Sequence, residues 1–186
     1  MQTKPAIKAS KSESATFRLD SETMKNLREE SKQKDISTNT LLNQIVKEHL
    51  NWHANASKAG FIAVRRLLIT NLISYLSEQQ IISVAENVAK NTNKDSILFL
   101  KKEYTMKSAL DLIETWIKIS GYPYRHEVVN NGENKHSYVI QHDMGKKWSI
   151  YLANSYQFLF DELGESKRRI EFEKTHSTLA FRVYIN

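Results

Sequence analysis

The chain has 186 residues, 40% of them hydrophobic and 26% charged, which is the composition of a soluble globular protein. Its 27 Lys and Arg residues outnumber its 21 Asp and Glu residues, and this basic surplus favours a polyanionic partner such as nucleic acid. The absence of cysteine excludes disulfides and thiolate metal sites. No apolar run approaches the roughly 20 residues of a membrane span, and the N-terminus lacks the apolar core of a signal peptide, so we expect a cytoplasmic protein with no membrane partner.

The N-terminal region begins with residues 1–13, a polar and lysine-rich stretch that we interpret as a flexible basic arm. In residues 15–19, apolar and polar side chains alternate as they do in a half-buried strand. Asp20 follows and is a suitable N-cap for a helix predicted over about 21–34.

A second helix is predicted after a short interruption. Ser37 is a good N-cap, and the apolar side chains after it recur at helical spacing. They make one broad apolar face, formed by Leu41, Leu42, Ile45, Val46 and Leu50. The pattern predicts that this helix continues past Trp52 until Gly60.

The rest of the chain changes from helices to strands at Gly121. Residues 61–120 predict three or four amphipathic helices, at about 62–77, after Ser77, at 97–102 and from near Thr105 onward. Strands are then predicted at 124–129 and 137–141 around Asn131-Gly132, followed by a helix at 146–163 ending at Gly164 and by strands at 169–174 and 178–185. This order predicts a ββαββ module.

The isolated N-terminal strand suggests how the protein assembles. A five-residue strand followed by helices cannot satisfy its own edge hydrogen bonds. The simplest solution is antiparallel pairing with the same strand of a second chain around a two-fold axis. The product is a two-stranded ribbon resting on four helices, and such a ribbon fits the major groove of DNA.

These residues resemble the Arc/MetJ/CopG ribbon–helix–helix family over about residues 14–52. The resemblance is carried by Ala15-Thr16-Phe17-Arg18-Leu19-Asp20-Ser21-Glu22, by Ile36-Ser37-Thr38-Asn39 and by Leu41-Leu42. It implies a prokaryotic DNA-binding dimer, often a repressor or an antitoxin. One departure is Asp35, which stands where the family often has glycine before the second helix, although aspartate tolerates a left-handed backbone better than most residues.

The alternation of strand side chains assigns roles to the two faces of the ribbon. Ser14, Thr16 and Arg18 point outward together. Arg18 can donate two hydrogen bonds to guanine, and Thr16 and Ser14 can bond base edges, whereas the alternative is that all three are solvated strand residues. The inward face and the second helix would form the dimer core, made of Phe17, Leu19, Leu42, Ile45 and Val46.

The start of the second helix is a candidate phosphate site. Free backbone N–H groups and the positive end of the helix dipole suit an anion, and Ser37, Thr38 and Asn39 stand there. The family resemblance implies the same use, which is compatible with Ser37 capping its own helix. The lysines of the arm either add non-specific phosphate contacts or belong to a solvated tail: Lys4, Lys8 and Lys11.

The C-terminal module offers weaker signals. It holds His126, His136, His142 and His176. A metal-sensing site that brings His126 close to His142 is conceivable, but no tight ligand spacing supports it, so we predict no metal and no cofactor. Asp143 is expected to cap the following helix, with an anion site at that helix end as the alternative. The aromatic residues of 148–160 exceed one helix face and point to a dimer or partner surface, or to a small-molecule pocket.

Together these patterns predict an α+β, mostly helical fold with an arm (1–13), a ribbon–helix–helix domain (14–59), a helical region (60–120) and a ββαββ domain (121–186). The expected function is a transcriptional regulator that binds double-stranded DNA as a homodimer or higher oligomer. Its C-terminal domain would sense a small-molecule effector or oligomerise. The alternative is an antitoxin or other interaction module whose C-terminal part binds a partner protein. An enzyme is not expected, because no catalytic constellation is present.

Overall fold

The computed structural model describes residues 13–130, 134–164 and 170–185. Residues 1–12 of the predicted arm, with its lysines including Lys11, lie outside these ranges, as does Asn131-Gly132. The chain divides into two compact units, Met1–Glu48 and His49–Asn186. Within the described ranges, none of the helices combines the length and the apolar character needed to cross a bilayer.

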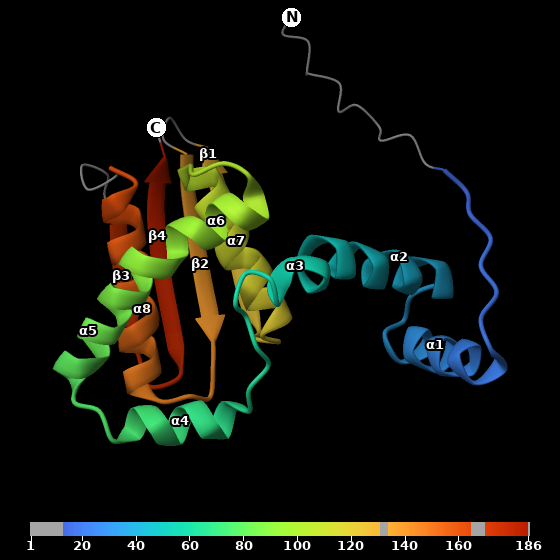
Figure 1. Ribbon diagram of the computed structural model, residues 1–186, viewed down its shortest axis with the longest axis horizontal. Helices are drawn as coiled ribbons and strands as arrows, with labels where there is room; N and C mark the ends of the chain where they lie inside the picture. The colour runs from blue at the N-terminus through green and yellow to red at the C-terminus, as the bar shows by residue number, and fades with distance from the viewer. Residues whose placement is uncertain (1–12, 131–133, 165–169, 186) are drawn as a thin grey trace, which may run out of the picture. The chain divides into compact units, whose positions relative to one another are not determined.

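The first unit consists of an extended segment and two helices (Figure 1). Residues 13–20 are extended, α1 spans Ser21–Gln33, and α2 spans Thr38–Glu48. Both helices begin where the sequence predicts them, whereas the predicted strand at 15–19 does not belong to a sheet within the described part of the chain. Among the described residues of this unit, only Ser31 and Leu41 are buried.

The turn between α1 and α2 follows from the chemistry of helix ends. The N–H of Ile36 donates to the carbonyl of Ser31 at 3.0 Å, and the N–H of Asp35 donates to that of Lys32 at 3.2 Å. This pair of bonds is the Schellman arrangement, which requires a left-handed residue just after the helix. Asp35 supplies it with a φ of 52°, as its tolerance for that conformation predicts.

The second unit begins with helices and ends with the ββαββ module. Its helical elements are η1 (His49–His53, π-helical), α3 (Ala54–Ala56), α4 (Arg66–Ser74), α5 (Glu78–Val88), η2 (Ala89–Asn93, π-helical), α6 (Lys94–Lys101), α7 (Met106–Ile119) and α8 (Lys146–Glu162). Its strands are β1 (Tyr124–Asn130), β2 (Asn134–Gln141), β3 (Ile170–Lys174) and β4 (Thr178–Ile185).

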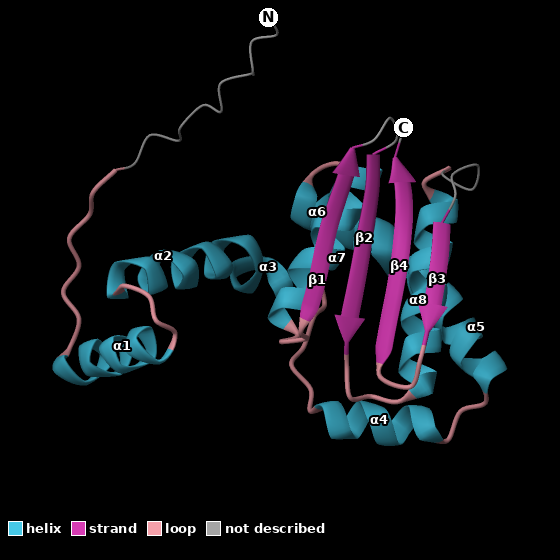
Figure 2. Cartoon of the chain, turned by 180° about the vertical axis from the view of Figure 1, so that it is seen from behind, coloured by secondary structure: helices cyan, strands magenta, loops and turns pink. Residues whose placement is uncertain are grey.

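The four strands form one antiparallel sheet in the order β1-β2-β4-β3. The helices α5, α6, α7 and α8 lie on one side of this sheet, as Figures 1 and 2 show from opposite sides. The other face is not covered by any helix drawn in Figure 2. The predicted ββαββ module is therefore confirmed, and so is the α+β class.

The helices of the middle region and the module share a single hydrophobic core. Buried residues of α6 and α7 join those of α8 and the sheet in one cluster. A row of rings crosses the covered face of the sheet, because the register places His126 opposite Tyr138, Tyr138 opposite Phe181, and Phe181 opposite Phe172. Their ring centroids are 4.0, 4.7 and 5.9 Å apart, and this stacking adds to the stability gained from burial.

Three sequence predictions of local structure need correction. The helix expected to continue past Trp52 until Gly60 does pass Trp52, but it contains the π-helical turn η1 and ends at Ala56 in α3. The helix expected at 62–77 is shorter, because α4 begins only at Arg66. Asp143 does not cap α8: Gly145 occupies the N-cap position, with a φ of 81°, and a capping side chain must stand directly before the helix. Asp143 instead pairs with Arg66 at 3.8 Å.

Candidate nucleic-acid interface

The extended segment is anchored where it meets α1. The backbone N–H of Thr23 donates to Asp20 Oδ1 at 2.8 Å, and the Thr23 hydroxyl donates to Oδ2 at 2.6 Å. The hydroxyl and backbone hydrogen bonds from Thr23 lower the pKa of the Asp20 carboxyl below its ordinary value. Asp20 is therefore a charged N-cap at neutral pH, as the sequence predicts, and it fixes the point at which the extended segment leaves α1.

The three residues predicted to contact bases all lie on this segment. Ser14, Thr16 and Arg18 are exposed, and they occupy alternate positions of an extended backbone. Among the described residues, Arg18 has no ion-pair partner, so its guanidinium is free to bind an external acceptor. The backbone of residues 13–19 likewise makes no hydrogen bond within the described part of the chain.

The predicted dimer-core residues are largely uncovered in the single chain. The side chains of Phe17 and Leu19 are 68% and 44% exposed. Ile45 and Val46 of α2 are exposed as well, whereas Leu42 is half-buried. The first unit therefore exposes much apolar surface to solvent. Covering one such side chain would stabilise the protein by about 1.5–3 kcal/mol.

The predicted phosphate-contacting residues come together at the start of α2. Ser37 Oγ accepts a hydrogen bond from the Thr40 N–H at 3.0 Å, which is the predicted cap. The Thr38 hydroxyl lies 3.2 Å from the buried Ser31 hydroxyl, so this side chain joins α2 to α1. Asn39 is exposed. Among the described residues, the N–H groups of Thr38 and Asn39 have no acceptor, which leaves two donors at the positive end of the helix.

His126 lies beside His136 and not beside His142, the pair considered for a metal site. His126 contacts His136, with 3.1 Å between Nε2 and Nδ1, and its Nδ1 lies 3.2 Å from the Glu114 carboxylate. His142 is separate and buried. Within the described ranges, no group of three or more His, Asp or Glu side chains is arranged to hold a metal ion.

His142 is built into the structure as a neutral ring. Its Nδ1 accepts from the Met144 N–H at 3.4 Å, so the proton resides on Nε2, which lies 2.9 Å from Ser149 Oγ. The Ser149 hydroxyl in turn donates to the Thr175 carbonyl at 2.7 Å. Burial lowers the pKa of His142 below its ordinary value of 6.5, and burial with the neighbouring His126 lowers that of His136.

We therefore expect the second unit to lose stability in acid. A histidine with a lowered pKa stabilises the folded state fully above the unfolded value of 6.5, and that contribution is lost as the pH falls through the folded pKa. The loss is at most about 1.4 kcal/mol per pH unit for each histidine. Urea unfolding on either side of pH 6.5 measures the effect. The double variant His136→Gln/His142→Gln should flatten the pH dependence. An equal slope in the wild type and the double variant would contradict this assignment.

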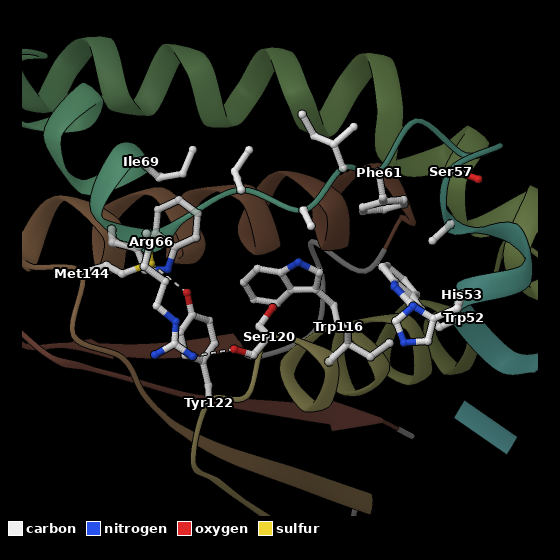
Figure 3. A pocket seen from close by; sticks show the side chains of 16 residues that line it. Trp52, His53, Ser57, Phe61, Arg66, Ile69, Trp116, Ser120, Tyr122 and Met144 are labelled. Carbon is white, nitrogen blue, oxygen red and sulfur yellow. Dashed lines mark hydrogen bonds between the residues drawn. The ribbon is translucent and has the colours of Figure 1, made fainter. Parts of the chain in front are cut away.

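A cavity in the second unit contains residues that sequence reasoning missed (Figure 3). It has a volume of about 570 Å³, and its lining includes the aromatic rings of Trp52, Phe61, Trp116, Tyr122 and Trp148. Trp148 alone belongs to the aromatic stretch that suggested a pocket. No local signal could have found the others, because they come from three separate segments of the chain.

Comparison with known proteins found no match to the chain among protein-family models, curated proteins or solved structures.

Proposed function

We propose that this protein is a sequence-specific DNA-binding regulator that acts as a homodimer, with a ribbon–helix–helix unit formed by residues 14–48 of two chains. One observation carries the proposal: residues 13–19 are extended, anchored at Asp20, unpaired within the described chain, and lined with exposed apolar side chains. Such a segment lacks both a hydrogen-bonding partner and a hydrophobic cover, and a second copy supplies both.

Antiparallel pairing of two segments accounts for the exposed apolar side chains. In a ribbon, side chains at alternate positions share a face, so Phe17 and Leu19 would point together toward the helices. The exposed apolar residues of α2, Ile45 and Val46, would then be covered by the ribbon and by the partner's helices. A two-fold axis makes the interface self-complementary, which suits an unpaired edge.

The opposite face of the same ribbon would read DNA. Ser14, Thr16 and Arg18 would lie in the major groove, where an arginine can bond guanine O6 and N7 together. The free N–H groups at the start of α2 would each meet a phosphate, fixing the protein on the duplex without reading its sequence. In this proposal the second unit senses an effector or promotes further oligomerisation.

Selection of binding sites from a random duplex library tests base reading by the ribbon. The wild-type protein should enrich a two-fold symmetric sequence, because a symmetric dimer binds two half-sites. Arg18→Ala should lose preference at one base position in each half-site, at a cost of about 1–3 kcal/mol, while remaining folded and dimeric.

The matched control is Arg28→Ala, which removes an exposed arginine from α1 of the same unit. This variant should select the same sequence as the wild type. An Arg18→Ala protein that loses affinity equally for every sequence would show that Arg18 contacts only phosphate, and selection of no sequence by the wild type would refute the proposal.

A further inference from the structure

The cavity of the second unit has a distinct chemical character. Its walls carry five aromatic rings together with aliphatic side chains and Met144. Its lining includes one permanently charged side chain, Arg66, and no carboxylate among the described residues. A cation would be repelled by Arg66 and would meet no carboxylate in the lining, so the cavity suits a neutral or negatively charged molecule with flat apolar parts.

Arg66 is held at one end of the cavity. Its Nη2 donates to the carbonyl of Ser120 at 2.6 Å and lies 3.4 Å from that of Gly121, and its guanidinium carbon lies 4.8 Å from the centre of the Tyr122 ring. Its ion pair with Asp143 is long, at 3.8 Å, and Asp143 is 89% exposed. Solvent weakens such a pair, so most of the guanidinium charge stays available to another anion.

The cavity has two different ends. Figure 3 shows Arg66, Tyr122 and Met144 at one end and Trp52, His53 and Phe61 at the other, with Trp116 between them. The rings of Trp52 and Phe61 are 4.7 Å apart, and those of Trp116 and Tyr122 are 5.7 Å apart. An occupant would therefore place its rings against the tryptophans and its charge beside Arg66.

We propose that this cavity binds a flat, largely aromatic small molecule that carries one carboxylate or similar anionic group, with Arg66 as the anion-binding residue. The volume falls in the range of pockets that bind metabolite-sized ligands. Arginine suits the role because its planar guanidinium keeps its charge at all physiological pH values and pairs with carboxylates through two hydrogen bonds.

The position of the cavity in the chain suggests what its occupancy would do. Trp52 and His53 belong to η1, which follows directly after α2 in the sequence. A ligand that contacts η1 would restrict the segment joining the two units, and so would alter DNA binding. This regulatory role rests on the proposed function, whereas ligand binding does not.

Calorimetric titration of the full chain with three probes of one shape tests the chemistry: naphthylacetate, its neutral amide and naphthylethylamine. Naphthylacetate should bind about ten-fold more tightly than the amide, which corresponds to one charge-assisted contact. The amine should bind most weakly. Failure of all three to bind, or binding of the amine as tightly as the acid, would overturn the proposal.

Two variants with matched controls locate the site. Arg66→Gln should make the acid and the amide bind equally, whereas Arg65→Gln, on the adjacent exposed arginine, should bind like the wild type. Ser57→Trp should fill the cavity from the other end and abolish binding of both probes, whereas Lys58→Trp, outside the lining, should not. Wild-type binding by Ser57→Trp would overturn the proposal even if Arg66→Gln failed to fold. Probe binding without any DNA binding would refute the proposed function alone.

Discussion

A Phe17→Asp variant is expected to be monomeric and to bind no DNA. Phe17 is 68% exposed in the single chain, yet in the proposed dimer it lies beneath the ribbon, between the helices of both chains. Each dimer would then bury two carboxylates facing each other across the two-fold axis, and burial of unpaired charge costs several kcal/mol per group. Light scattering coupled to gel filtration measures the oligomeric state, and fluorescence anisotropy of labelled DNA measures binding.

The neighbouring residue supplies the control. Thr16 lies next to Phe17 in the extended segment, and its side chain points to the opposite face. Thr16→Asp should keep the dimer and lose DNA binding, because its carboxylate would meet the negative charge of the groove rather than the core. A dimeric, DNA-competent Phe17→Asp protein, or a monomeric Thr16→Asp protein, would reverse the assignment of the two faces.

Phe181→Ala should destabilise the second unit by about 3–5 kcal/mol, the usual cost of truncating a large buried ring. Phe181 is 1% exposed, and its ring lies within 6 Å of those of Tyr138, Tyr156 and Phe172. Removing the ring leaves a void in the middle of the row across the sheet. The three tryptophans, residues 52, 116 and 148, all lie in the second unit, so their fluorescence during urea unfolding reports on this unit alone.

Val139→Ala on the adjacent strand is the matched control. Val139 points to the face of the sheet without helices and is 39% exposed, so its truncation should cost less than about 1 kcal/mol. Similar losses for the two variants would contradict the description of one covered and one open face. Native-like stability of Phe181→Ala would contradict the central place of the ring row in the core.

The parts of the fold that the sequence predicts well depend on local chemistry. Asp20 and Ser37 begin helices because their side chains accept hydrogen bonds from the N–H groups that a helix start leaves free. Gly164 follows α8 with a φ of 77°, which glycine adopts without strain. The four strands of the module could also be recognised in the sequence, although the start of the second was placed three residues late.

The segment before α4 shows how local reasoning fails. Residues 61–65 contain apolar side chains at spacings that fit a helix, yet they are not helical. No side chain there caps the helix, and α4 starts after Arg65, which lacks a capping hydrogen bond. Residues 61–64 instead line the cavity together with residues distant in the sequence, such as Trp116.

The histidine pairing depended on strand register. β2 extends from Asn134 to Gln141, so His126 faces Tyr138 and lies beside His136, while His142 falls beyond the strand end. The sequence expectation began the second strand at 137 and could not specify which residues would be paired. A register shift of two residues changes every cross-strand neighbour while leaving the alternation of faces unchanged.

The small core of the first unit also bears on how the protein would respond to its own abundance. Only Leu41 and Ser31 are buried among its described residues, so a single copy gains little free energy by ordering α1 and α2. If folding of this unit is completed only when two chains meet, its order rises with total protein concentration. Newly made chains would pass through a protease-sensitive stage, and operator occupancy would increase more steeply than in proportion to the amount synthesised. Dilution during cell growth would then release the operator abruptly rather than gradually.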